Sequence, residues 1–300
     1  MDINTKKLKK NAYRVTRNRG ITALRIRVPG GHLEASYLPL IREIADTYGN
    51  GTVHLTARQG FEVPGINFDD IREINAKIRP LLEMLGIPLD NPDGGYPAAG
   101  ARNISACIGN RVCPYANLDT TALAQRIERE LYPNDLHFKV AVTGCPNDCA
   151  KAHLQDFGVI GMTEPQYDEN RCISCLACMK NCRRRVTGAL SEENFAIRRS
   201  PDLCIGCGEC ILKCPTAAMT RSTTTFFRLV IMGRTGKKQP RMAQTFLEWV
   251  EEDTVVQVIK NTVGFVEQHI DRGLDKEHIG YIVDRTGYPA FRDAVLAGVP

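Results

Sequence analysis

Twelve cysteines constrain this chain more than any other feature, because their spacing divides them into three groups of four. One group joins a pair separated by five residues (CIGNRVC) to a pair separated by three (CPNDC). The other two groups are ferredoxin-type runs, and each cysteine of the second run lies 32 residues after its counterpart in the first. Since four thiolates are the usual ligand set of a 4Fe-4S cluster, the sequence predicts three such clusters.

The constant shift between the runs indicates an internal duplication of the two-cluster ferredoxin type, in which the fourth cysteine of each run ligates the other cluster. Pro215 follows the last cysteine of the second run as in that type, whereas Arg183 follows the last cysteine of the first. The expected ligand sets are Cys107, Cys113, Cys145 and Cys149 for the first cluster, Cys172, Cys175, Cys178 and Cys214 for the second, and Cys204, Cys207, Cys210 and Cys182 for the third.

Disulfides and structural zinc fit these cysteines less well. Disulfide frameworks belong to short chains in oxidising compartments, whereas this chain has 300 residues and no apolar segment of the signal-peptide or membrane-spanning kind. Structural zinc usually takes cysteine pairs with roughly two to four residues between them, so the five-residue gap suits zinc poorly. We therefore expect a cytoplasmic protein with no membrane partner.

The overall charge and the sequence motifs limit the classes of partner and cofactor that we expect. A net charge of +5 and 43% hydrophobic residues are ordinary for a globular protein, and this mild basicity does not predict a nucleic-acid partner. No G-x-G-x-x-G stands between a strand and a helix, so we expect no nicotinamide or flavin site on this chain. Electrons must then come from another protein. The basic run 183–185 fits either a solvated loop or the docking of an acidic donor.

Cations alternate with apolar residues in three segments, 22–28, 53–58 and 137–142, as expected for strands with one buried and one cationic face. Planar guanidinium groups on rigid strands suit carboxylates and oxyanions. The sequence therefore predicts a shared anion-binding surface near the first cluster. The residues on the cationic faces are Arg25 and Arg27, then His54, Thr56 and Arg58, then His137 and Lys139; those on the apolar faces are Leu24, Ile26 and Val28, then Val53, Leu55 and Ala57, then Phe138, Val140 and Val142.

Apolar stripes predict helices over 37–48, 71–85 and 117–131, and further helices from 244 to 271. A strand over 229–232 leads into a glycine-rich segment with three cations, Arg234, Lys237 and Lys238, which suits carboxylate binding. Strands that alternate with helices predict an α/β or α+β sandwich. We expect Trp249 to be a packing residue.

Four segments carry a family resemblance: RIRVPGG (25–31), HLTARQGFEVPG (54–65), RNISACIGNRVCP (102–114) and FKVAVTGCPNDC (138–149). They resemble the sirohaem-dependent sulfite and nitrite reductases, most closely the C subunits of three-subunit anaerobic sulfite reductases. The resemblance implies an α+β fold, the sulfite/nitrite reductase-type α/β sandwich, with an inserted two-cluster ferredoxin-type domain. The expected domains are 1–162, 163–222 and 223–300.

The resemblance also implies a function. The chain would be the catalytic subunit of a dissimilatory-type enzyme that reduces sulfite to sulfide in a six-electron reaction at sirohaem coupled to the first cluster, with the Cys149 sulfur as the axial ligand of the sirohaem iron. Its implied partners are sulfite, a ferredoxin-like subunit and a flavin subunit that takes electrons from NADH, in an oligomer. The alternatives are reduction of nitrite to ammonia and a non-catalytic role in electron transfer.

Matching by motif assigns roles to individual cations. Arg27, or else Arg25, would bind the substrate together with Arg102 and Lys139, and His137 stands where the family has a lysine. Because the charge of a histidine near neutral pH depends on its surroundings, its role stays open. The implied sirohaem-binding residues are Arg58, Thr56, His54, Arg234, Lys237 and Lys238.

Overall fold

The computed structural model of the chain describes residues 12–87, 103–132, 134, 136–236, 239–274 and 277–299. It divides into two compact units, which we describe separately. The first unit contains 1–105, 121–140 and 263–288, and the second contains 106–120, 141–262 and 289–300. In the described part of the chain, no helix has the length and apolar character needed to cross a bilayer.

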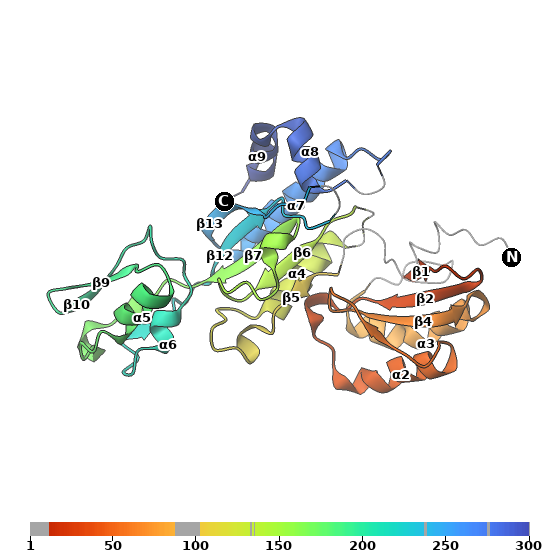
Figure 1. Cartoon of the computed structure of the whole chain (residues 1–300), viewed down its shortest axis with the longest axis horizontal. Helices are drawn as coiled ribbons and strands as arrows, with labels where there is room; N and C mark the ends of the chain where they lie inside the picture. The colour runs from red at the N-terminus through yellow and green to blue at the C-terminus, as the bar shows by residue number, and fades with distance from the viewer. Residues whose placement is uncertain are drawn as a thin grey trace. The chain divides into compact units, whose positions relative to one another are not determined.

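The first unit contains an antiparallel four-stranded sheet in the order β1-β2-β4-β3. Helices α2 (Leu38–Thr47) and α3 (Ile71–Met84) cover one face of it (Figure 1). Both helices were predicted, and their apolar stripes pack on the inward face of β2. The strands are β1 (Tyr13–Val15), β2 (Ile21–Ile26), β3 (His54–Leu55) and β4 (Phe61–Asn67), with short 3-10 turns at Pro29–Gly31, Ala35–Tyr37 and Phe68–Asp70.

Helices α4 (Thr120–Leu131) and α8 (Ile279–Thr286) also belong to the first unit. Gly30 packs on the start of α4: its φ is +73°, and a Cβ there would lie 3.0 Å from the Cα of Thr121. The Thr121 hydroxyl donates to the Gly30 carbonyl at 3.3 Å. Glycine is therefore required where the end of the RIRVPGG segment meets this helix.

The second unit is built on a five-stranded sheet in the order β13-β12-β7-β6-β5. Strand β12 pairs antiparallel with both β13 and β7, and the interior strands are almost completely buried. Helix α9 (Tyr288–Leu296) packs on this sheet through the Phe246 and Phe291 rings, whose centroids are 5.9 Å apart. The strands are β5 (Ser105–Ala106), β6 (Val140–Thr143), β7 (Phe157–Met162), β12 (Phe226–Ile231) and β13 (Gln244–Val250), and α7 (Glu252–His269) follows β13.

Between β7 and β12 the chain forms a set of small helices and strands, and we call this segment, residues 163–222, the insert (Figure 1). Helices α5 (Ala177–Arg185) and α6 (Glu209–Leu212) pack against each other. Strand β8 (Gln166–Tyr167) pairs with β11 (Met219–Thr220), and β9 (Leu190–Glu193) forms a hairpin with β10 (Ala196–Arg199). The insert has its own apolar core, which includes cysteines of both runs.

Three expectations about strands and helices were wrong in part. The segment 53–58 has no buried face, because only β3 pairs within it, at the edge of the sheet: Val53 is 38% and Leu55 70% exposed. Strand β6 begins at Val140 rather than at 137, although Phe138 and Val140 are buried as expected. Residues 244–250 form β13, since pairing with β12 outweighs their helical pattern.

Candidate cluster sites and an anion pocket

The first cysteine group lies on two loops of the second unit. Cys107 follows β5 and its amide donates to the Val142 carbonyl, while the Gly144 amide donates to the Cys107 Sγ at 3.1 Å. Burial raises the pKa of the Cys145 thiol, and charge on Cys107, Cys113 and Cys149 raises it further because these thiols are close by. The structure therefore brings together all four cysteines of this group.

Tight backbone packing shapes these loops. A Cβ on Gly144 would lie 2.6 Å from the Cβ of Ala116, and one on Gly109 would lie 2.7 Å from the Thr120 hydroxyl, so neither position tolerates a side chain. After Cys145, the Asp148 carboxylate accepts from the Ala152 and His153 amides and contacts the His153 ring at 2.7 Å. These contacts fix the turn that carries Cys149.

The eight cysteines of the insert line two separate cavities. Each cavity contains three cysteines of one run and the fourth cysteine of the other, which is the grouping expected for two cross-ligated clusters. In the parts of the chain that the structure describes, no three His, Cys, Asp or Glu side chains are arranged to hold a single metal ion. The first cavity is lined by Cys172, Cys175, Cys178 and Cys214, and the second by Cys182, Cys204, Cys207 and Cys210.

The thiol pKa values agree with this grouping. Burial raises the pKa of Cys178, and charge on Cys214 and Cys175 adds to the rise. Burial likewise raises the pKa of Cys207 to about 11 and of Cys210 to about 12. Charge on thiols of their own group adds to both rises, together with charge on Glu209 at Cys207 and on the nearby Cys178 at Cys210. At Cys214 burial is outweighed by hydrogen bonds from Met219, Thr216 and Ala218, so its pKa is lowered.

The duplication is also visible in the backbone. Ser174 and Leu176 have φ values of +51° and +58°, and the positions 32 residues later, Gly206 and Gly208, have +67° and +72°. The first repeat therefore adopts the same left-handed conformation without glycine, at a cost of roughly 1 kcal/mol or more for each of the two residues. Successive left-handed turns can direct amides towards an anion such as a thiolate-ligated cluster. The basic run 183–185 is exposed in the last turn of α5, where cations complement the helix dipole.

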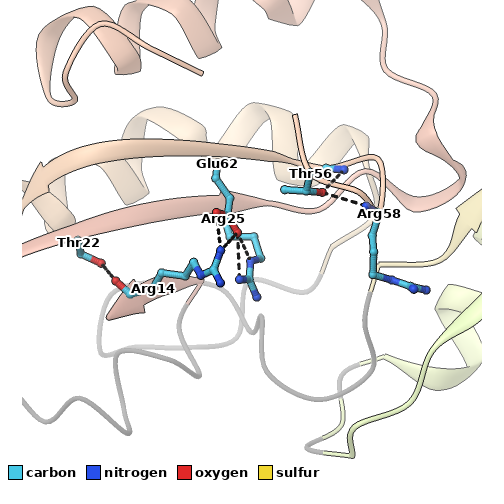
Figure 2. A network of polar contacts seen from close by, with 7 residues as sticks. Arg14, Thr22, Arg25, Thr56, Arg58 and Glu62 are labelled. Carbon is cyan, nitrogen blue, oxygen red and sulfur yellow. Dashed lines mark hydrogen bonds and ion pairs between the residues drawn. The ribbon is translucent and has the colours of Figure 1, made fainter. Parts of the chain in front are cut away.

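The first unit contains a hollow of about 220 Å³ with a cationic lining. Arg14 and Arg25 converge on the Glu62 carboxylate, with Nη1 to Oε2 at 2.8 Å and Nε to Oε1 at 3.0 Å (Figure 2). Burial raises the pKa of Glu62, but the two guanidinium groups outweigh this and lower it overall. The other lining residues include Arg27, Thr56, Arg58 and Asn103.

Arg58 is held by backbone carbonyls and points away from Glu62 (Figure 2). Its Nε donates to the Asn103 carbonyl at 3.0 Å and its Nη2 to the Val140 carbonyl at 2.9 Å. The Thr56 hydroxyl accepts from the Gly60 amide and so fixes the turn before β4. The buried Asn103 Oδ1 has no hydrogen-bond partner within the described structure, which leaves an acceptor at the pocket.

Arg27, the favoured substrate arginine, is only 2% exposed. Its guanidinium pairs with Glu128 and lies 3.9 Å from the centroid of the Tyr132 ring. Arg25 is the more accessible of the two, with a side chain that is 26% exposed. The structure thus places both arginines on the pocket lining, but embeds Arg27 in a buried ion pair.

The other predicted cations are dispersed. His137 and Lys139 are half-buried, and the His137 ring packs edge-on against His278 with centroids 4.8 Å apart. His54 is exposed. Arg234 is buried in the second unit, where its Nε donates to the Gln239 carbonyl. Arg102, Lys237 and Lys238 lie outside the described residues.

Three polar or charged side chains of the described pocket lining were not predicted from the sequence: Arg14, Glu62 and Asn103. Glu62 had a usable signal, because it stands between the apolar Phe61 and Val63 in the segment GFEVPG. Its pairing with Arg25 depends on the β2-β4 register, and this register requires the structure.

Comparison with known proteins identifies the family of this chain. A family model described as the "Nitrite and sulphite reductase 4Fe-4S domain" matches residues 98–299. A second, the "Nitrite/Sulfite reductase ferredoxin-like half domain", matches residues 14–81. The chain is 42% identical to the C subunit of the anaerobic sulfite reductase of Salmonella typhimurium, over 97% of this chain and 88% of that protein.

More distant relatives share part of the chain. It is 30% identical to the "Coenzyme F420-dependent sulfite reductase" of Methanocaldococcus jannaschii over 59% of this chain and 27% of that protein. The fold resembles the crystal structure of dissimilatory sulfite reductase I, with a TM-score of 0.71 at 18% identity over 92% of this chain and 69% of that one. Taken with the arrangement of the thiols, these matches show that the chain belongs to the nitrite and sulphite reductase family of oxidoreductases, whose 4Fe-4S domain it contains.

Proposed function

We propose that this chain is the catalytic subunit of an anaerobic, dissimilatory-type sulfite reductase, which reduces sulfite to sulfide with six electrons. The observation that carries the proposal is the grouping of twelve thiols into three sets of four, in a chain that is similar over nearly its full length to one subunit of an anaerobic sulfite reductase. Each set would hold one 4Fe-4S cluster. The two sets of the insert would deliver electrons to the set of Cys107, Cys113, Cys145 and Cys149.

The residues present suit the cofactors that the family implies. Sirohaem carries many carboxylates, and the first unit supplies a hollow whose lining includes the guanidinium groups of Arg14, Arg25 and Arg58. At about 220 Å³ this hollow is smaller than a typical small-molecule site of roughly 300 to 1,000 Å³, so it suits a carboxylate arm or a small anion rather than a whole macrocycle. When bound, sirohaem would supply the iron that holds the substrate and accepts electrons.

The chain's own side chains would bind the cofactors, orient the substrate and supply protons to it. Cys149 would help to hold both the first cluster and the sirohaem. Arg58, oriented by two backbone carbonyls, would place its guanidinium against a sirohaem carboxylate. Arg25 or Arg27 would orient the anionic substrate with Arg102 and Lys139, because cations stabilise charge on departing oxygens. Thr56, His54, Arg234, Lys237 and Lys238 remain proposed sirohaem contacts, and His137 a proposed proton donor.

The relative's name describes one subunit of a larger enzyme, which supports the proposal that this chain works with partner subunits. Electrons would reach the insert from a ferredoxin-like subunit, which would itself be reduced by a flavin subunit that takes electrons from NADH. The chain would work as part of an oligomer. Cytoplasmic location remains an expectation from the cysteine usage.

The test begins with anaerobically purified protein. Its absorption spectrum should contain the Soret and red bands of sirohaem in addition to cluster absorption, and iron analysis should give three clusters plus the tetrapyrrole iron. Reduced viologen should then drive the formation of sulfide from sulfite. If the protein contained clusters but no tetrapyrrole, the proposal would be wrong and the chain would be a non-catalytic electron carrier.

Nitrite is the second candidate substrate. About half of this chain is 30% identical to the "Ferredoxin--nitrite reductase, chloroplastic" of Spinacia oleracea. Competition between sulfite and nitrite in one assay gives the ratio of their kcat/KM values, and a ratio in favour of nitrite would reverse the assignment.

A further inference from the structure

The loop that carries Cys207 is pressed against the end of strand β7. The Thr163 amide donates to the Gly206 carbonyl at 3.0 Å. A Cβ on Gly206 would lie 2.7 Å from the Cβ of Met162, and its φ is +67°. Only glycine allows this approach, so the backbone beside Cys207 is fixed to the body of the second unit.

Asn117 connects this loop to the first cysteine group. Its side-chain amide donates to the Gly206 carbonyl at 3.3 Å and to the Gly161 carbonyl at 3.4 Å. Its backbone amide donates to the carbonyl of Gly144, which directly precedes Cys145, at 2.7 Å. One buried asparagine therefore links the residues next to Cys207 and Cys145.

Arg221 completes the connection from the far end of the insert. Its Nε donates to the Asn117 Oδ1 at 3.1 Å, and its Nη2 donates at 2.7 Å to the carbonyl of Pro114, which directly follows Cys113. Through this guanidinium the insert contributes a positive charge beside the first group. Together Asn117 and Arg221 join three loops, each of which carries a cysteine of the first or third set.

The second set has a different environment. Cys175 is exposed, and Ile173, which also lines its cavity, is 64% exposed. The neighbouring hairpin tip at Phe195 is 82% exposed, and its carbonyl accepts from the Ser174 hydroxyl at 3.5 Å. Surfaces of this kind are accessible to another protein.

We propose that the set of Cys182, Cys204, Cys207 and Cys210 is the output site of the insert, and that Asn117 and Arg221 are positioning residues that hold it beside the first set. The set of Cys172, Cys175, Cys178 and Cys214 is the input site. This inference rests on the proposed function, in which all three sets hold clusters. A reduced one-electron iron-sulfur donor passes one electron to the input cluster; each cluster is then oxidised by one electron as the next is reduced, and no bond is made or broken.

Asn117 and Arg221 would affect electron transfer to the first cluster in two ways, through the distance between clusters and through the charge of Arg221. Electron transfer slows steeply as the distance between clusters grows, so loops fixed by hydrogen bonds keep the rate high. A cation beside Cys113 also stabilises the extra negative charge of the reduced first cluster, because charge and hydrogen bonds near the thiolates set its potential. Removal of Arg221 therefore lowers that potential as well as the transfer rate.

The test compares Arg221→Gln with Arg199→Gln in the anaerobically purified holoenzyme. Arg199 is a matched control, because it lies on the same insert and pairs with Glu164 and the Trp249 ring rather than with a cluster loop. Flash reduction of the insert by a photoreduced ferredoxin, followed by rapid-freeze EPR, measures the transfer to the first cluster. Arg221→Gln should slow this transfer at least about tenfold, the scale on which small displacements affect positioned reactants, whereas the control should match the wild type.

A redox titration followed by EPR gives the second readout. Arg221→Gln should lower the potential of the first cluster and leave the input cluster unchanged, while Arg221→Lys, which keeps the charge, should restore the potential but not the full rate. If Arg221→Gln does not retain its clusters, the rates of electron transfer in Arg221→Lys and Asn117→Ser test the inference instead. Wild-type rate and potential in these variants, with all three clusters present, would overturn the inference but not the proposed function; absence of clusters from the wild type would overturn the proposed function.

Discussion

Glu62 lies directly opposite Arg25 in the β2-β4 ladder, and its carboxylate accepts from the Arg25 guanidinium at 3.0 Å within a pocket whose other charged lining residues are arginines. An acid at this position reduces the net charge available to an anionic ligand. It also holds the side chains of Arg14 and Arg25 in fixed orientations. Glu62 therefore sets both the strength and the geometry of the anion pocket.

The first prediction concerns Glu62→Gln. Without the carboxylate, Arg14 and Arg25 should bind anions more strongly, so the KM for sulfite should fall several-fold, which corresponds to about 1 kcal/mol. Steady-state assays with reduced viologen measure this change. Asp46→Asn is the control, because it removes an equal charge from an exposed ion pair of the same unit, outside this pocket. An unchanged or higher KM in Glu62→Gln would mean that this carboxylate does not weaken anion binding.

A second prediction follows from the lowered pKa of Glu62. Because its folded pKa lies below its unfolded value, Glu62 stabilises the first unit above the unfolded pKa, and this contribution disappears as the pH falls through the folded pKa. Hydrogen exchange of the β2 and β4 amides should therefore accelerate more in the wild type than in Glu62→Gln as the pH falls below 4.5, the ordinary glutamate value. Equal acceleration, after correction for the intrinsic exchange rate, would contradict the assigned ion pairs.

The third prediction separates Arg27 from Arg25. Arg27→Met leaves Glu128 buried without its partner; burial already raises the pKa of this carboxyl, and loss of the Arg27 charge raises it further. Breaking a buried pair costs about 3 to 5 kcal/mol, so denaturant unfolding should show a large loss of stability. Arg25→Gln, at a partly exposed site, should instead raise the KM for sulfite with a stability change below about 1 kcal/mol.

The double variant Arg27→Met/Glu128→Leu completes that experiment. Replacement of both partners removes the unpaired charge, so this variant should be more stable than Arg27→Met alone. Normal stability in Arg27→Met together with a loss of sulfite binding would restore Arg27 as the substrate arginine.

Features that depend on local spacing were predictable from the sequence, and features that depend on pairing were not. The helices α2 and α3 and the cysteine groups follow from periodicity and from the 32-residue repeat. The edge position of β3 and the strand at 244–250 depend on which strands pair, so the apolar pattern of Leu55 was misleading. The Arg27–Glu128 pair joins residues 101 positions apart, and nothing in local sequence specifies it.

The last prediction tests the cross-ligation of the insert. Cys172 and Cys214 belong to different runs but line one cavity, whereas Cys172 and Cys182 belong to the same run but line different cavities. Cys172→Ser/Cys214→Ser should therefore damage one cluster, and Cys172→Ser/Cys182→Ser should damage two, because each cluster takes its fourth ligand from the other run. Iron analysis and EPR of the anaerobically purified variants count the clusters that remain. Both variants lack two thiols of the insert, so each is a control for the other. If Cys172→Ser/Cys214→Ser instead lost two clusters and Cys172→Ser/Cys182→Ser lost one, each run would ligate its own cluster.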